Sequence, residues 1–125
     1  MRGGDRTSLG LWGEKQAARY LKKQGFRLLE TRFRCREGEI DLVVSRGPYL
    51  CFVEVKLRRD DHFATAREQV TAAKQRKILV TAEHFLAQHP EMGEYRCRFD
   101  VAEVYAPEGL NTRKPEIRYF EHAFW

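Results

Sequence analysis

Alternating apolar and charged residues mark the centre of this chain. In residues 38–44 (GEIDLVV) and 52–56 (FVEVK), apolar and β-branched residues alternate with acidic residues and a lysine. A period of two residues predicts β-strands, because successive side chains of a strand point to opposite faces of a sheet. Gly47 and Pro48 separate the two stretches and predict a turn. We therefore expect an antiparallel hairpin at the centre of the fold.

The register of this hairpin decides which charged residues meet. Pairing around a tight turn places Asp41 opposite Glu54 and Glu39 opposite Lys56, all on one face. A β-bulge would change this parity. Two neighbouring carboxylates repel each other, and burying them is costly unless a cation neutralises them.

Two interpretations of the acidic pair remain open. In the first, it belongs to a solvated strand face held by ion pairs such as Glu39 with Lys56. In the second, the carboxylates bind a hard divalent cation such as Mg²⁺, which prefers oxygen ligands from carboxylates, water and phosphate. The lysine would then orient a water molecule or stabilise charge on a phosphate. This second interpretation predicts metal-assisted hydrolysis of phosphodiester bonds.

Two helices are predicted, one on each side of the hairpin in the sequence. The first begins near Ser8, a residue suited to an N-cap, and ends near Gln24, where Gly25 is suited to the C-terminal turn. The second runs over about 65–89 and stops before Pro90, since proline disfavours the helical conformation of the residue before it.

Each helix carries one charged residue on its apolar stripe. Glu14 lies on the same face as Ala17 and Leu21, and Lys74 lies one turn before Ile78. Glu14 is either a first-turn acid that complements the helix dipole or a third carboxylate above the sheet. Lys74 either extends its ammonium group outward to water or directs it into the site.

Three further strands complete the predicted order αβββαββ. They cover residues 26–36, 95–105 and 117–120. This order predicts one α/β or α+β domain over residues 1–125 with a mixed central sheet. Residues 1–7 are rich in glycine and arginine, and we expect them to be frayed.

Two groups of arginines are candidates for phosphate contacts. Arg32, Arg34 and Arg36 alternate along the first predicted strand and so share one face. They form either a row that faces phosphates or a solvated edge that discourages pairing between sheets. Arg58 and Arg59 begin a polar loop beside the predicted site and are expected to touch a phosphate backbone.

The composition favours a folded protein with an anionic partner. Of 125 residues, 42% are hydrophobic and 33% are charged, with a formal net charge of +5. These proportions exclude an intrinsically disordered chain. The positive charge favours a polyanion such as nucleic acid.

Cysteine usage and the apolar segments predict a cytoplasmic location. Cys35, Cys51 and Cys97 form no CxxC pair, so we expect reduced thiols and no zinc site. No apolar run approaches the length that spans a bilayer, so no membrane partner is expected. The N-terminal residues lack the apolar core of a signal peptide.

Six ordered motifs over nearly the whole chain resemble those of the YraN-like family of uncharacterised bacterial proteins. Their order and their intervals make the resemblance far more specific than any single motif would. The motifs are GEKQAA at 13–18, GEIDL at 38–42, FVEVK at 52–56, VTAAK at 70–74, RFDV at 98–101 and AF at 123–124.

That family is similar to the PD-(D/E)xK nuclease superfamily and, within it, to archaeal Holliday-junction resolvases. The resemblance implies a restriction-endonuclease-like fold and a DNA endonuclease that depends on Mg²⁺ or Mn²⁺, with branched DNA as a candidate substrate. Paired cuts across a junction would require a homodimer. The alternative is a nucleic-acid-binding protein on a nuclease scaffold with little or no catalysis.

The resemblance also implies roles for individual residues. Asp41 and Glu54 would hold the metal with the Val55 carbonyl, and Lys56 would position the attacking water. Glu14 would complete the acidic set by holding a second metal or a metal-bound water. Ile40 stands where the superfamily motif has proline, a position that is loosely kept. Phosphate contacts are expected from Arg32, Arg34, Arg36, Arg58, Arg59 and Lys74.

Overall fold

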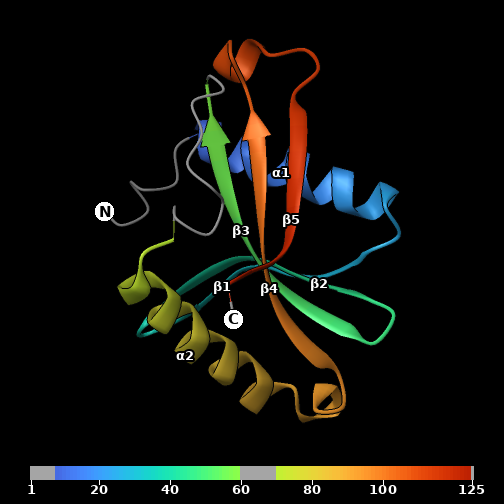
Figure 1. Cartoon of the computed structure of the whole chain (residues 1–125), viewed down its shortest axis with the longest axis vertical. Coiled ribbons are helices and arrows are strands. Elements are labelled where there is room, and N and C mark those ends of the chain that lie inside the picture. The colour runs from blue at the N-terminus through green and yellow to red at the C-terminus, as the bar shows by residue number, and fades with distance from the viewer. Residues whose placement is uncertain (1–7, 60–69, 125) are drawn as a thin grey trace.

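A computed structural model describes residues 8–59 and 70–124. Its elements follow the order αβββαββ that the sequence predicts, and they form a mixed α+β structure (Figure 1). The N-terminal segment 1–7, for which fraying is expected, lies outside the described residues. The elements are α1 (Ser8–Lys23), β1 (Arg27–Cys35), β2 (Gly38–Arg46), β3 (Tyr49–Arg58), α2 (Ala72–Gln88), β4 (Arg96–Tyr105) and β5 (Glu116–Phe124), with short 3-10 helices at Pro90–Met92 and Gly109–Asn111.

The five strands form one sheet in the order β1-β2-β3-β4-β5. Only the central pair β3–β4 is parallel among these strands, and the other neighbours are antiparallel. The parallel pair follows from the connection, because a parallel neighbour requires a crossover and α2 lies between β3 and β4 in the chain. The mixed sheet that the sequence predicts is therefore confirmed.

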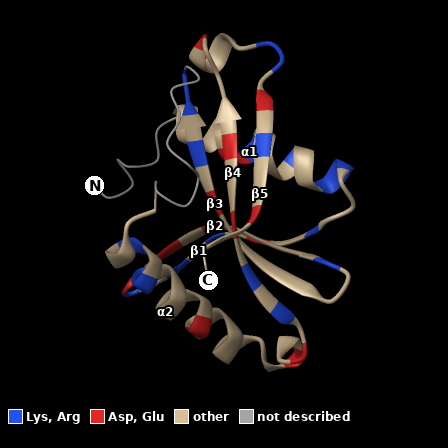
Figure 2. Ribbon diagram, viewed as in Figure 1, with Lys and Arg blue, Asp and Glu red and all other residues tan. Residues whose placement is uncertain are grey.

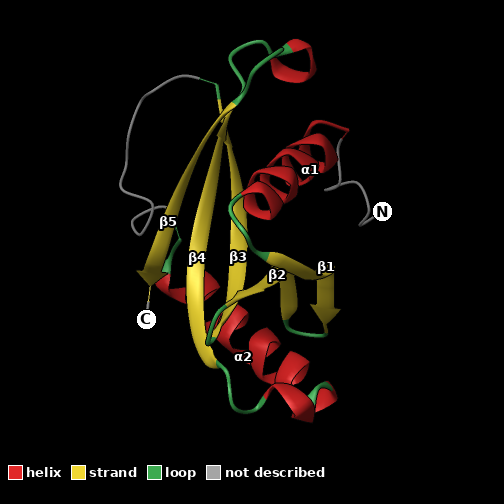
Figure 3. Ribbon diagram, turned by 90° about the vertical axis from the view of Figure 1, so that its right-hand side faces the viewer, coloured by secondary structure: helices red, strands yellow, loops and turns green. Residues whose placement is uncertain are grey.

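The two helices cover opposite faces of the sheet (Figures 1 and 3). Leu21 of α1 packs in a core with Val53 of β3, and Phe85 of α2 packs in a second core with Phe52 of β3. Adjacent residues of β3 thus belong to different cores, as strand alternation requires. Burial of each such side chain stabilises the fold by about 1.5–3 kcal/mol.

The described part of α2 begins later than the sequence pattern predicts. Its first residue is Ala72, and Thr71 caps it by accepting a hydrogen bond of 3.2 Å from the backbone N–H of Lys74. Residues 65–69 of the predicted helix lie outside the described residues. A hydroxyl that satisfies an N–H group of the first turn marks a helix start, so the prediction of one helix from residue 65 was wrong at this end.

The central hairpin has longer strands than predicted, and its described pairs follow the predicted register but end before the expected pairs Asp41–Glu54 and Glu39–Lys56. Described pairs run from Leu42–Val53 to Arg46–Tyr49, with only Gly47 and Pro48 left for the turn. Gly47 has a φ of +59°, which a residue without a side chain adopts most readily. The last strand is also longer than predicted, because β5 pairs with β4 over most of its length.

The β1–β2 hairpin changes the face that it presents to the helices. Leu42 belongs to the core under α1, whereas Ile40 and its partner Phe33 belong to the core under α2. Regular alternation would keep residues 40 and 42 on one face. Arg32, with a φ of +50°, lies on β1 at the level of the change, and Asp41 lies at the same level on β2.

A buried polar network joins β4 to β5. The Asp100 carboxylate is fully buried and accepts hydrogen bonds from the Tyr119 hydroxyl, the His122 backbone N–H and the Arg98 guanidinium. The register between the strands shifts beside Asp100. A buried carboxylate needs such donors, because each polar group left without a partner costs free energy.

We predict that Tyr119→Phe lowers the free energy of unfolding by about 1–3 kcal/mol, because the buried Asp100 carboxylate then loses one of its donors. Urea denaturation measures the change. Tyr95→Phe is the matched control, since Tyr95 is exposed. Equal stability of the two variants would show that the Tyr119 hydroxyl contributes nothing to the network.

Candidate functional site

The candidate site is centred on the carboxylate of Glu54 in β3, which is 7% exposed. Lys74 Nζ lies 2.5 Å from Glu54 Oε2, and Lys56 Nζ lies 3.7 Å from the same oxygen. Lys56 follows Glu54 by two residues and so points to the same face of the strand. Lys74 comes from the first turn of α2. The cations that neutralise this buried acid are therefore two lysines from different elements.

The two lysines differ in their electrostatics. Burial lowers the pKa of Lys56, and the positive charge of Lys74 lowers it further, so the attraction of Glu54 is not enough to restore it. Burial also acts to lower the pKa of Lys74, but the charge and hydrogen bond of Glu54 outweigh burial and raise it. Lys56 is consequently the lysine that loses its proton more easily.

Asp41 lies beside this group on the neighbouring strand. Its Oδ2 accepts a hydrogen bond of 2.8 Å from the backbone N–H of Val55. The described backbone pairs of β2 and β3 end at Leu42–Val53. The Asp41 side chain connects the same two strands just beyond that pair. The negative charge of Asp41 acts to raise the pKa of both Lys56 and Lys74. The structure thus brings Asp41, Glu54 and the two lysines into one charge cluster.

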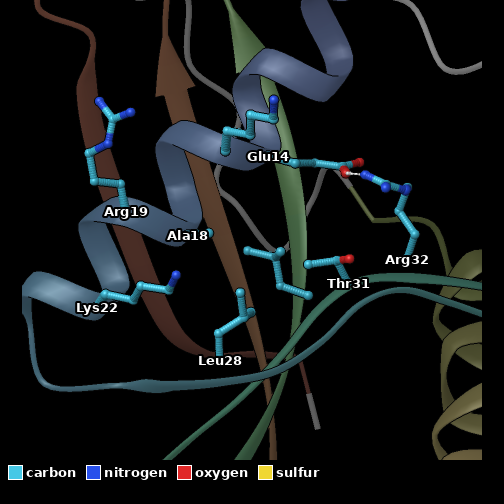
Figure 4. A pocket seen from close by; sticks show the side chains of 9 residues that line it. Glu14, Ala18, Arg19, Lys22, Leu28, Thr31 and Arg32 are labelled. Atoms are coloured by element: carbon cyan, nitrogen blue, oxygen red, sulfur yellow. Dashed lines mark hydrogen bonds and ion pairs between the residues drawn. The ribbon is translucent and has the colours of Figure 1, made fainter.

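Glu14 reaches the sheet from the opposite face. It lies on the buried side of α1 with 6% exposure, and its Oε1 is 3.1 Å from Arg32 Nη1 (Figure 4). Gly13 permits the close approach of the helix, because a Cβ there would lie 2.9 Å from the Leu57 side chain. The pairs that flank Arg32 also flank Asp41 on β2. Glu14 is therefore connected to the Asp41 level of the hairpin through Arg32.

Two arginines of the predicted row pair with acids. Arg32 pairs with Glu14, and Arg34 Nε lies 3.1 Å from Glu39 Oε2. The positive φ of Arg32 interrupts the alternation on which the row was predicted. Arg36 is exposed in the turn that follows β1.

Arg58 is the last residue of β3, two residues after Lys56 of the charge cluster, and Arg59 follows it. Arg58 Nε is 3.9 Å from Glu103 Oε2 on the neighbouring β4, and Arg59 is exposed. The Glu103 carboxylate is 3% exposed and also accepts a hydrogen bond from the Tyr105 hydroxyl. Arg58 thus has an acidic partner in the fold, as Arg32 and Arg34 do.

Sequence reasoning missed a basic groove between α1 and the β1–β2 hairpin. The groove has a volume of about 400 Å³, and the apolar side chains of Leu28 and Leu42 line it with Ala18 (Figure 4). Basic residues occur along α1 (Figure 2). Lys15, Arg19 and Lys22 follow one another at spacings of four and three residues, which places them on one face of the helix. The sequence does contain this signal. The basic residues that line the groove are Lys15, Arg19, Lys22 and Arg32.

Within the described ranges 8–59 and 70–124, neither helix combines the length and apolar character needed to cross a membrane.

Comparison with known proteins assigns the chain to a family. The model of the uncharacterised protein family UPF0102 matches residues 13–104. UPF0102 proteins of Pelotomaculum thermopropionicum and Nitrosomonas europaea are 42% and 40% identical, covering 95% and 89% of this chain and 97% and 88% of their own lengths. A UPF0102 protein of Acinetobacter baumannii (strain AYE) is 44% identical over 74% of this chain and 70% of its own. The charge cluster and the groove described above are therefore features of a protein that belongs to the uncharacterised protein family UPF0102.

Proposed function

We propose that this protein is a DNA endonuclease that depends on Mg²⁺ or Mn²⁺ and hydrolyses phosphodiester bonds, with branched DNA as its candidate substrate. The observation that carries the proposal is the convergence of Asp41, buried Glu54, Lys56 and Lys74 at one level of the sheet. A structural ion pair needs one acid and one base. Four charged groups gathered around a buried carboxylate, at a desolvation cost, mark a candidate catalytic site.

The donor set of the cluster fits a hard divalent cation. The carboxylates of Asp41 and Glu54, with the backbone carbonyl of Val55, offer the oxygen ligands that Mg²⁺ and Mn²⁺ prefer. The hydrogen bond from the Val55 N–H orients Asp41, and the two lysines orient Glu54. A bound metal would supply Lewis-acid activation of a phosphate and of a water molecule.

The lysines would divide the work that the protein itself does. Lys56 is suited to hold and orient the attacking water. Lys74, whose pKa is raised, keeps its charge and is suited to stabilise negative charge on the phosphate. Glu14 would act in this arrangement by holding Arg32 beside Asp41.

The groove would position the DNA backbone. Lys15, Arg19 and Lys22 line it on the α1 side, and Glu14 with Arg32 forms its boundary at the hairpin. Basic side chains in such a groove neutralise phosphates and release counterions, which gives affinity without sequence selectivity. We therefore assign the groove to backbone contacts and the cluster to chemistry.

Nucleic-acid binding without cleavage is the second candidate function. The Lys74 ammonium group, at 2.5 Å from Glu54 Oε2, already supplies the positive charge that a metal would bring to this carboxylate. If Lys74 stays there when metal is present, Glu54 is a structural acid and the basic groove alone defines the activity. The metal response of the two acids separates these functions.

We predict that Mn²⁺ raises the melting temperature of the wild type and that Asp41→Asn and Glu54→Gln abolish this shift. A ligand that binds only the folded state stabilises it by mass action, and each substitution removes one metal ligand. Melting curves in Mn²⁺ and in EDTA measure the effect. Glu39→Gln is the control, because this acid of the same hairpin pairs with Arg34. A shift that persists in both variants would place the metal elsewhere.

We predict that loss of the Lys56 side chain affects DNA cleavage more strongly than DNA binding. Lys56→Ala should lower the cleavage rate by about 10²–10³-fold, as expected for loss of one group that stabilises developing charge, and leave DNA affinity nearly unchanged. Lys74→Ala should lower both. The assay uses duplex, single-stranded, flap and four-way DNAs with Mg²⁺ or Mn²⁺, and Lys77→Ala on the exposed side of α2 is the control. Binding without cleavage of any DNA would support the second function instead.

DNA affinity is predicted to fall steeply with salt, and the groove residues should account for the slope. Arg19→Ala and Lys22→Ala should each reduce the slope of log K against log salt by about one unit, because each removes one phosphate contact. Fluorescence anisotropy at several salt concentrations measures this slope. Arg96→Ala, an exposed change at the start of β4, should leave it unchanged. Identical slopes in all variants would exclude the groove as the binding surface.

A further inference from the structure

Three potential metal ligands meet where the β1–β2 turn approaches α2, away from the charge cluster. They are Cys35 at the end of β1, Glu37 in the turn and His84 on α2. Cys35 Sγ lies 3.4 Å from Glu37 Oε1, and His84 Nε2 lies 3.3 Å from the same oxygen. All three ligand atoms lie within 4.8 Å of one another.

The fold holds these residues together through the close approach of the turn to the helix. A Cβ at Gly38 would lie 3.1 Å from Thr81 Oγ1, so the absence of a side chain lets the turn sit against α2. Thr81 is fully buried, and its hydroxyl lies 3.4 Å from Cys35 Sγ. His84 follows Thr81 by three residues and therefore lies on the same face of the helix. The helix that carries His84 thus also contacts Cys35, through Thr81.

Two of the three separations between the ligand atoms match those around a tetrahedral zinc ion. With Zn–S distances of about 2.3 Å and Zn–N or Zn–O distances of about 2.0–2.1 Å, neighbouring ligands in a tetrahedron are roughly 3.3–3.6 Å apart. The observed separations of 3.4 Å and 3.3 Å fall in this range. Thiolate and imidazole ligands favour Zn²⁺ over Mg²⁺, which prefers oxygen.

We propose that Cys35, Glu37 and His84 form a Zn²⁺ site with a fourth position for water. The expectation of no zinc rested on the absence of paired cysteines in the sequence, whereas this set takes one ligand from each of three residue types. Bound zinc would fasten the β1–β2 turn to α2. It would stabilise the fold, because the free energy of binding adds to that of folding. The proposal stands independently of the proposed nuclease activity.

An ordinary ion pair between Glu37 and His84 is the competing explanation. Their side chains are 44% and 48% exposed, and an exposed ion pair contributes little to the stability of a protein. Such a pair needs neither the thiol of Cys35 nor a metal. The thiol therefore provides the decisive readout.

The test is metal titration of the full chain after treatment with a chelator, in the presence of a reductant that does not bind metal. We expect one equivalent of Zn²⁺ to bind and to raise the melting temperature, and Co²⁺ to give a thiolate charge-transfer band. Cys35→Ser should remove that band, and Cys35→Ser and His84→Ala should each lower Zn²⁺ affinity by about tenfold or more, since even loss of a supporting group costs that much.

Two controls separate this site from other thiols and from the charge cluster. Cys97→Ser changes an exposed cysteine and should retain wild-type binding and the Co²⁺ band. Asp41→Asn should also retain both, so failure of the nuclease proposal leaves this result unaffected. Absence of stoichiometric Zn²⁺ binding, or wild-type affinity in the His84→Ala variant, overturns the proposal. Because His84 is exposed, its variant remains informative even if Cys35→Ser does not fold.

Discussion

The candidate site depends on the burial of the Glu54 carboxylate. Removing a charge from water costs several kcal/mol unless nearby cations and hydrogen bonds compensate for the lost hydration. Lys56 supplies one cation from the same strand, and Lys74 supplies the other from α2. The hydrogen bond that the Lys74 backbone N–H donates to the Thr71 hydroxyl fixes the first turn of α2, which carries Lys74. Lys74 therefore takes part both in the start of α2, through its backbone N–H, and in the neutralisation of Glu54, through its side chain.

Much of the fold was predictable because burial leaves a regular pattern in the sequence. The alternation in 38–44 and 52–56 predicts the central hairpin and its register, which the ladder from Leu42–Val53 to Arg46–Tyr49 confirms. The position of Lys74 one turn before Ile78 indicated a lysine on the buried side of a helix. For Glu14, the same reasoning predicted a place on the buried stripe, and the structure buries it.

Other features depend on contacts that no local pattern records. The alternation of Arg32 and Arg34 predicted a shared face, but a left-handed backbone at Arg32 directs it to Glu14. The neutralisation of Glu54 by two lysines also required knowledge of where α2 packs. Cys35 and His84 are far apart in the sequence, and the close approach at Gly38 brings them together. These features arise from tertiary packing, which local periodicity does not determine.

The change of face in the β1–β2 hairpin connects the two layers of the molecule. In a flat sheet, Glu14 of α1 and Glu54 on the α2 side of β3 would stay on opposite faces of the sheet. At the level of Arg32 and Asp41, the hairpin leaves the α1 core and enters the α2 core. Arg32 can then hold Glu14 while Asp41 bonds to the Val55 N–H beside Glu54. Glu14 of α1 and Glu54 of β3 are thus both connected to the part of the hairpin that holds Arg32 and Asp41. A change in the backbone there would alter the contacts of both acids together.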